Sequence, residues 1–199
     1  MGSVRFLVPA VMRVFLAVSC GEQLTSALTT GLDDWRSGPG GGLALRWTRP
    51  AAWHVTLQFL GDWPQNCLGS LETALEAARD QRVFTLSPGG IGGFPDLKSP
   101  RVLFLHMEDD GQAGELALRV RKIVNETWRE GPQDNRDFRC HLTLARIRKR
   151  LSSVEAKLLQ EMELKDLPPV RVEGFSLVAS ELRPQGPRYR ELAFYPLRK

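Results

Sequence analysis

Two short stretches of the chain repeat the same arrangement of histidine and threonine. The first is HVTL at residues 54–57, and the second is HLTL at residues 141–144. A β-strand alternates its side chains between two faces, so each His and Thr points one way and their apolar neighbours point the other. Each strand is therefore expected to give an apolar face to the core and a His/Thr face to a functional site. Two of the three histidines of the chain occupy this setting.

The residue types of the two stretches indicate acid–base chemistry on a phosphate group. An imidazole loses its proton near neutral pH, so His54 and His141 can serve together as a base and an acid. The hydroxyl groups of Thr56 and Thr143 are suited to holding phosphate oxygens. This set, with a nearby cation, fits phosphodiester chemistry that needs no metal, and the chain has no H-x-x-x-H or C-x-x-C spacing typical of metal ligands.

A single H-x-T would be best explained as part of an ordinary strand. The repeat changes this, because chance rarely duplicates both the polar pair and its apolar partners. The third histidine, His106, has no threonine at the matching position, and we expect it to be structural.

Several other residues are candidates for contacts with a substrate. Arg146 comes five residues after His141, so strict alternation puts it on the opposite face, although a twist or bulge at the strand end would bring it round. Tyr189 is a candidate to face the site and stack on a base, with an ordinary surface tyrosine as the alternative. Arg136 and Arg139 are placed to guide a phosphate backbone, but solvated surface charges explain them equally well.

The remaining candidates have simpler explanations. Phe59 and Trp53 fall on the face opposite His54, so core packing is expected for both. For Arg188 and Arg190, contact with a phosphate backbone and a solvated surface charge are equally good explanations. The glycine run at residues 37–42 lacks the lysine of a phosphate-binding loop and is interpreted as a flexible connection.

Periodicity along the chain predicts strands and helices in alternation. Strands are expected at residues 13–18 and 53–60 and in the second motif, and a strand pair joined by a long Gly/Pro connection is expected over 84–107. Two further strands, 170–182 and 188–197, are expected to close the chain. Helices are expected at 22–36, 64–80, 112–130 and, after a capping-box sequence at residues 152–155, up to residue 165.

This order predicts an α+β protein with mostly antiparallel sheet and helices on the outside. The pattern of strand, helix, motif strand and helix recurs in both halves, so two similar lobes should share a cleft, related by a pseudo-twofold axis. No linker separates them, and we expect one domain over residues 12–199.

Composition adds limits of its own. The net charge of +4 suits an anionic ligand such as RNA, but it also fits basic proteins that bind none. The three cysteines are widely spaced and odd in number, which favours reduced thiols in a cytoplasmic protein.

The first twenty residues have some features of a bacterial signal peptide. However, Arg13 interrupts the apolar run, where a charge would be costly in a membrane. We interpret this run as the buried first strand and expect Met12 to be the functional start, with residues 1–11 as an extension and no membrane span.

From residue 12 onward the chain resembles the two-histidine phosphoesterase superfamily, and within it the bacterial and archaeal RNA 2′,3′-cyclic phosphodiesterases, also called 2′-5′ RNA ligases. The resemblance rests on MRVFLAV, RWTRPAAWHVTLQFLGD, GGFPDLKSPRVLFL, FRCHLTLARIR and FSLVASELRPQGPRYRELAFYPL. Cys140 stands where the family usually has a proline just before the second histidine. That difference affects the entry into the strand and not the reacting groups.

The resemblance implies a bilobal fold with a water-filled cleft between two sheets, and hydrolysis of a terminal 2′,3′-cyclic phosphate to a 2′-phosphate. One imidazole would deprotonate water and the other would protonate the departing 3′-oxygen. We favour His141 as base and His54 as acid, although the near symmetry leaves the reverse assignment open. Thr56, Thr143 and Arg146 would hold the phosphate oxygens.

The resemblance implies substrates that are RNA ends or nucleotides carrying a 2′,3′-cyclic phosphate. No cofactor or metal is expected, and a monomer is the default expectation. Three alternatives stay open at this point: an RNA-end binding module with little catalysis, an enzyme acting on a small cyclic nucleotide, and one acting on a 2′-5′ oligonucleotide. The reverse reaction, 2′-5′ ligation of RNA, is a further possibility.

Overall fold

The computed structural model describes residues 11–129, 134, 136–183 and 186–199. Within this part of the chain the regular elements are β1 (Val11–Ser19), α1 (Gly21–Ser37), β2 (Arg46–Trp47), β3 (His54–Pro64), α2 (Leu68–Leu75), β4 (Phe84–Phe94), β5 (Val102–Glu108), α3 (Gln112–Thr127), β6 (His141–Arg146), α4 (Ser153–Gln160), β7 (Val170–Val172), β8 (Gly174–Glu181) and β9 (Arg188–Pro196). Short 3₁₀ turns lie at Pro50–Ala52, Gln65–Cys67 and Glu76–Asp80. The predicted α+β class is confirmed.

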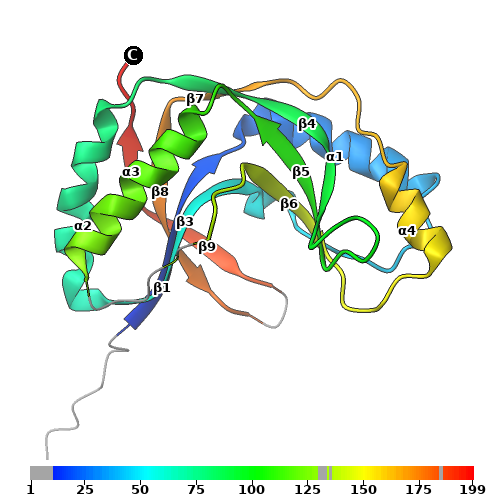
Figure 1. Ribbon diagram of the computed structural model, residues 1–199, viewed down its shortest axis with the longest axis horizontal. Coiled ribbons are helices and arrows are strands. Elements are labelled where there is room, and N and C mark those ends of the chain that lie inside the picture. Colours follow the sequence, from blue (N-terminus) through cyan, green and yellow to red (C-terminus); the bar gives the residue numbers. More distant parts are fainter. Residues whose placement is uncertain (1–10, 130–133, 135, 184–185) are drawn as a thin grey trace, which may run out of the picture.

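The strands form one curled sheet with the order β7-β4-β5-β6-β3-β1-β8-β9, and β2 pairs with β6 beside this path (Figure 1). All pairings between these named strands are antiparallel. The two sheets expected from the sequence are the two halves of this order. They join where the motif strands meet, through the single pair Val55–Leu142.

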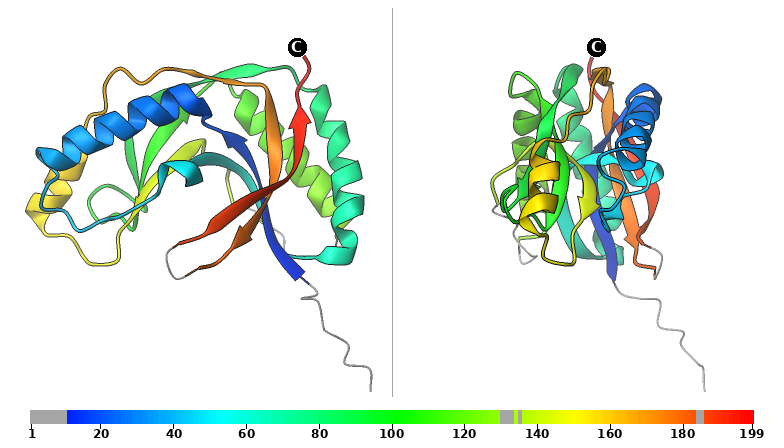
Figure 2. Two further views of the ribbon diagram at one scale, coloured as in Figure 1. Left: turned by 180° about the vertical axis from the view of Figure 1, so that it is seen from behind. Right: turned by 90° about the vertical axis from the view of Figure 1, so that its right-hand side faces the viewer.

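The four helices of the described residues cover the two halves in pairs (Figures 1 and 2). Helices α2 and α3 lie against the half that contains β1 and β3, and α1 and α4 lie with the other half. Helix α1 follows β1 but contacts β7, and α3 follows β5 but contacts β3. Each half is therefore completed by a helix that comes from a strand of the other half, which ties the two into one body.

The core confirms the expected apolar face of the motif strands. Val55, Leu57, Leu142 and Leu144 are all buried, and they belong to one hydrophobic cluster that spans both halves of the sheet. Burial of this face leaves the histidines and threonines of the same strands on the face that the helices do not cover.

The Gly/Pro connection predicted within residues 84–107 is largely wrong. Strand β4 runs through it to Phe94, with an irregular register between Pro88 and Ile91, and the connection is confined to residues 95–101. Gly92 explains why this strand carries glycine, because a Cβ there would lie 2.4 Å from the ring of Phe104. Glycine therefore serves close packing here and does not mark a turn.

Other boundaries differ from the prediction by a few residues. Strand β3 continues through Gly61, at φ +72°, to Pro64. Helix α3 ends at Thr127 because the next residue, Trp128, leaves helical geometry and packs edge-on against Trp63, with ring centroids 4.9 Å apart. The capping box at Ser152 is present, but α4 ends at Gln160, and Met162 just beyond it is buried.

The apolar run near the N-terminus forms strand β1, as predicted, with Val14 to Val18 buried. Residues 1–10 of the expected extension lie outside the described residues, and Val11 already belongs to the strand. None of the helices in the described ranges has the length and apolar character needed to cross a bilayer. The three cysteines form no disulfide.

The junction between the two halves predicts a stability effect. Leu142 is fully buried at the joining pair, so Leu142→Ala should lower the free energy of unfolding by about 2–5 kcal/mol, because it removes apolar contacts and leaves a cavity. Denaturant unfolding would measure this. Leu118→Ala is the matched control, since Leu118 is 62% exposed, and its effect should stay within about 0.5 kcal/mol. Equal effects of the two substitutions would contradict the proposed junction.

Candidate active site

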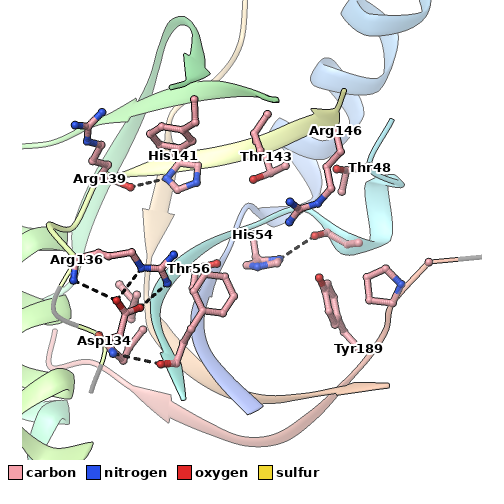
Figure 3. Close-up of a pocket in the computed structure, with 18 of the residues that line it drawn as sticks. Thr48, His54, Thr56, Asp134, Arg136, Arg139, His141, Thr143, Arg146 and Tyr189 are labelled. Atoms are coloured by element: carbon pink, nitrogen blue, oxygen red, sulfur yellow. Dashed lines mark hydrogen bonds and ion pairs between the residues drawn. The ribbon is translucent and has the colours of Figure 1, made fainter. Parts of the chain in front are cut away.

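A cleft of about 970 Å³ lies on the face of the sheet away from the helices. Both motif strands line it, and the cleft brings together the side chains of His54, Thr56, His141 and Thr143 (Figure 3). All four are half-buried. The sequence prediction that residues 87 positions apart share one site is thus met in the geometry.

Both imidazoles are held in the same way by the backbone. The Nδ1 atom of His54 lies 2.8 Å from the carbonyl oxygen of Ala52, and that of His141 lies 2.6 Å from the carbonyl oxygen of Arg139. A carbonyl oxygen only accepts, so Nδ1 must carry the proton in each ring. Each Nε2 therefore remains available to exchange a proton within the cleft.

The antiparallel direction of the motif strands sets which residues are neighbours across the cleft. Around the Val55–Leu142 pair, antiparallel register brings His54 beside Thr143 and His141 beside Thr56. Each imidazole is thereby next to the hydroxyl of the other motif, and the four polar groups have approximate twofold symmetry.

Each motif ends in a bulge at its leucine, and the bulge of the second motif explains the position of Arg146. On β6, Thr143 pairs with Phe104 and Ala145 with Leu103, so Leu144 has no partner on β5. As a result Leu144 and Ala145 are both buried, and Arg146 returns to the face of His141 and lines the cleft. This is the irregularity that the sequence analysis required for Arg146.

The same irregularity makes the prediction for Phe59 wrong. On β3, Thr56 pairs with Ala17 and Gln58 with Leu16, which leaves Leu57 without a partner on β1. Gln58 turns to the buried face, and Phe59 lines the cleft with 49% of its surface exposed. Phe59 and Arg146 therefore occupy equivalent positions, five residues after their histidines.

Aromatic rings hold His54 from the first half of the sheet. Phe15 lies 4.8 Å from the His54 ring, and Tyr189 meets that ring edge-on at 5.3 Å. Phe15 and Tyr189 also contact each other at 5.0 Å. Tyr189 lines the cleft, as predicted, while Trp53 is buried in the core, also as predicted.

A matching aromatic group holds His141 from the second half. Phe94 and Phe104 lie 5.1 and 5.2 Å from the His141 ring, both edge-on, and stack on each other at 4.4 Å. His106 is exposed, pairs with His141 in the β5–β6 register, and its ring lies 4.8 Å from that of Phe104. His106 is not among the residues that line the cleft.

Burial lowers the pKa of both imidazoles below the ordinary value of 6.5. For His54, the positive charge that His141 can carry lowers the pKa further, and the hydrogen bond to Ala52 partly opposes the shift. For His141, the hydrogen bond to Arg139 opposes the shift, while the charges of His106 and Arg139 add to it. Both rings are therefore neutral in the free protein at neutral pH.

Burial also raises the pKa of the Tyr189 phenol, and the charge of Arg146 offsets part of that rise. Tyr189 therefore stays protonated and can donate a hydrogen bond. The pKa of the Cys140 thiol, next to His141 in the chain, is raised by burial to about 12. Cys140 is therefore no nucleophile at neutral pH.

One rim of the cleft contains a polar network that the sequence analysis missed in part. Arg136 makes two short contacts with Asp134, of 2.8 and 2.6 Å, and its guanidinium lies 5.7 Å from the centre of the Phe59 ring. Arg121 donates to the side chain of buried Gln58 and to the carbonyl of Arg136. These bonds fix the rim to the bulge of β3. In the sequence, this network is indicated only by Gln58, a polar residue within an otherwise apolar strand.

Arg139 lies on the same rim, with its guanidinium 5.6 Å from the centre of the Phe94 ring. The opposite rim contains Arg46, which pairs directly with Arg146 in the β2–β6 register, together with Thr48 and Arg49. Arg46 was not predicted to line the cleft, because a strand of two residues has no periodicity to reveal it.

The cleft has few groups suited to a metal. In the parts of the chain that the structure describes, no cluster of three or more His, Cys, Asp or Glu side chains could hold a metal ion. The carboxylates among the lining residues are Asp134, which is bound by Arg136, and Asp137.

Comparisons with known proteins agree with this geometry. The family model described as LigT like Phosphoesterase matches the chain twice, at residues 24–104 and 109–189. Each match contains one His-x-Thr motif. The two matched segments thus reproduce the pseudo-twofold halves of the site.

Named relatives cover nearly the whole chain. A protein named RNA 2′,3′-cyclic phosphodiesterase from Thermus thermophilus is 34% identical, over 94% of this chain and 91% of its own. A protein of the same name from Archaeoglobus fulgidus is 29% identical, over 92% of this chain and 99% of its own.

Solved structures show the same fold. The crystal structure of TT0787 of Thermus thermophilus matches with a TM-score of 0.72 and 32% identity, over 94% of this chain and 98% of that one. Escherichia coli LigT, crystallised with 3′-AMP, has a TM-score of 0.72, 24% identity and coverage of 95% and 99%, and supports the fold alone. With the family match extending over both halves of the site, the chain belongs to the LigT-like phosphoesterases, enzymes that act on phosphodiester bonds.

Proposed function

We propose that the protein hydrolyses RNA ends or nucleotides that carry a 2′,3′-cyclic phosphate, leaving a 2′-phosphate and a free 3′-hydroxyl. The observation that carries this proposal is the matched orientation of the two imidazoles. Each is fixed through Nδ1 by a backbone carbonyl and keeps Nε2 available beside a threonine of the opposite motif. The name shared by the Thermus and Archaeoglobus relatives supports the choice of substrate.

In the proposed reaction, neutral His141 accepts a proton from water through Nε2 as the water oxygen attacks phosphorus. The bond from phosphorus to O3′ breaks on the opposite side, and protonated His54 donates its proton to the departing oxygen. The product has a 2′-phosphate and a 3′-hydroxyl, while His141 ends protonated and His54 neutral. A proton exchange with solvent resets the pair.

The remaining polar groups of the cleft would stabilise charge on the phosphoryl oxygens. Thr56 and Thr143 can donate hydrogen bonds to the two non-bridging oxygens, and Arg146 adds a positive charge beside them. Such donors are effective when they are already in place before charge builds up. With a 5′-hydroxyl group as the nucleophile in place of water, the same groups would serve 2′-5′ ligation, because the same bond from phosphorus to O3′ breaks.

The charges around each ring support this division of roles. Arg139 and His106 lie near His141 and favour its neutral form, which is the form a base requires. For His54, the charge that lowers the pKa is that of His141, and it contributes less than burial does. When His141 takes up the proton of water, His54 is therefore pushed to release its own.

Substitution of either histidine tests the proposal. His54→Ala and His141→Ala should each lower kcat on a 2′,3′-cyclic nucleotide by about two or more orders of magnitude, because each removes one proton transfer. His106→Ala is the comparison, since His106 is exposed and outside the cleft lining. It removes no proton transfer, so turnover at the pH optimum should stay within a few-fold, and the lost charge should only raise the pKa of His141 slightly. Release of the 2′-monophosphate is the measurement. Near-normal turnover in both single variants would defeat the mechanism.

The lowered pKa values predict where activity peaks. The base must be neutral, so kcat/KM falls as pH drops through its pKa, and the acid must be protonated, so kcat/KM falls as pH rises through its pKa. Because both pKa values lie below 6.5 in the free protein, the bell-shaped profile should have its maximum on the acid side of about pH 6.5. A profile that rises steadily to pH 8 would be incompatible with this pair.

Chelation of metals tests the proposed independence from cofactors. The cleft rims are dominated by arginine, and the described lining residues offer a divalent cation few carboxylates. Turnover should therefore be unchanged after dialysis against EDTA, with a metal-dependent phosphodiesterase assayed in parallel as the positive control. Loss of activity that Mg²⁺ or Mn²⁺ restores would rule out the two-histidine mechanism as written.

A further inference from the structure

A run of cations leaves the cleft at the end of the second motif strand. We define the basic rim as the exposed side chains of Arg46, Arg146, Arg148, Lys149 and Arg150. The first two line the cleft and are direct partners in the β2–β6 register. The other three follow in the chain immediately after β6, so the positive charge continues outward from the active site.

Residues 148–150 of the basic rim form a loop between β6 and α4, and this loop is fixed at both ends. Ile147 is buried, and its N–H donates to the carbonyl oxygen of Arg101 at 2.9 Å. At the other end, Ser152 caps α4, with its backbone N–H and its hydroxyl both bound to the carboxylate of Glu155. The three cations between these anchors are thus presented from a short loop with both ends tied to the fold.

The basic rim also differs from the rest of the surface because its cations form no ion pairs with carboxylates of the described residues. Nine ion pairs are found in the described residues, and they engage cations such as Arg79, Lys157 and Arg171, but none involves a side chain of the basic rim. Cations that keep a full charge in solvent are available for an anionic ligand.

The opposite rim does not offer the same surface. On the rim that contains Arg136, this arginine is neutralised by Asp134, and Arg121 is occupied by Gln58 and a backbone carbonyl. Arg139 is a single exposed charge there and lies over the ring of Phe94. The two rims of an otherwise symmetric cleft therefore differ, and only one of them continues into a run of uncompensated charge within the described residues.

We propose that the basic rim binds the phosphates of an RNA strand upstream of its terminal cyclic phosphate. The inference rests on the proposed function and extends it, because it makes a strand, and not a mononucleotide, the preferred substrate. Arg46 would take the phosphate next to the reacting one, and the loop cations the phosphates beyond it. A polymer with one negative charge per nucleotide matches a row of cations that begins at the reacting centre.

Removal of the loop charges tests this proposal without touching the catalytic groups. The variant Arg148→Gln/Lys149→Gln/Arg150→Gln is compared with the wild type on a 2′,3′-cyclic mononucleotide and on a short single-stranded oligoribonucleotide with the same end. At low salt we expect kcat/KM on the oligonucleotide to fall about tenfold, and the slope of log(kcat/KM) against log[salt] to become shallower by about 2. Turnover of the mononucleotide should not change.

A second triple variant provides the control. Arg82→Gln/Arg119→Gln/Lys122→Gln makes the same change in net charge at exposed positions away from the cleft lining, and should behave as the wild type on both substrates. An equal loss in this variant would show that only net charge matters and would overturn the proposal. Thermal unfolding of both variants checks that the fold is intact.

The outcomes separate this proposal from the proposed function. If the wild type turns over the mononucleotide but the loop variant leaves oligonucleotide turnover and its salt dependence unchanged, the basic rim proposal fails and the function stands. If neither substrate is turned over, the function fails. In that case, fluorescence anisotropy can still measure the affinity of the basic rim for an oligonucleotide that ends in a 2′-phosphate. Equal affinity of the wild type and the loop variant would refute the basic rim proposal.

Discussion

The structure depends on the contact between two antiparallel strands that share one register pair, Val55–Leu142. Both side chains of this pair are buried in a core common to the two halves, so the motif strands cannot shift by one residue without exposing their apolar face. The same constraint that buries the leucines and valine fixes His54 and His141 on the open face. Packing of the core and placement of the reacting groups are therefore one requirement, and not two that must be met separately.

The two bulges make the two ends of the otherwise symmetric cleft chemically different. Each occurs at the leucine that closes the motif, and each returns the residue five positions after the histidine to the cleft. At that position one strand presents Phe59 and the other Arg146. An aromatic surface at one end and a charge at the other distinguish the two sides of a ligand, although the imidazoles and threonines do not.

Much of this could be predicted from the sequence, and the reasons are physical. The alternation of apolar and polar residues in the motifs is strong, so their faces and the helices around them followed from periodicity. Phe59 was misplaced because a bulge depends on pairing with β1, which no local pattern records. The strand through Gly92 was read as a loop because glycine, which usually marks turns, here makes room for the Phe104 ring. Arg46 was missed because its position comes from pairing with β6 alone.

The asymmetry of the rims bears on which histidine acts as the acid. His54 lies at the end of the cleft shared with Thr143, Arg146 and Tyr189, and His141 lies at the end shared with Arg139 (Figure 3). The ring of Phe94 contacts His141 at that second end. A strand that departs over the basic rim would bring its terminal ribose, and with it the departing 3′-oxygen, to the side of His54. In-line attack would then bring water from the side of His141. In the proposed mechanism, this course of the strand agrees with the charges around His141, and both favour His54 as the acid and His141 as the base.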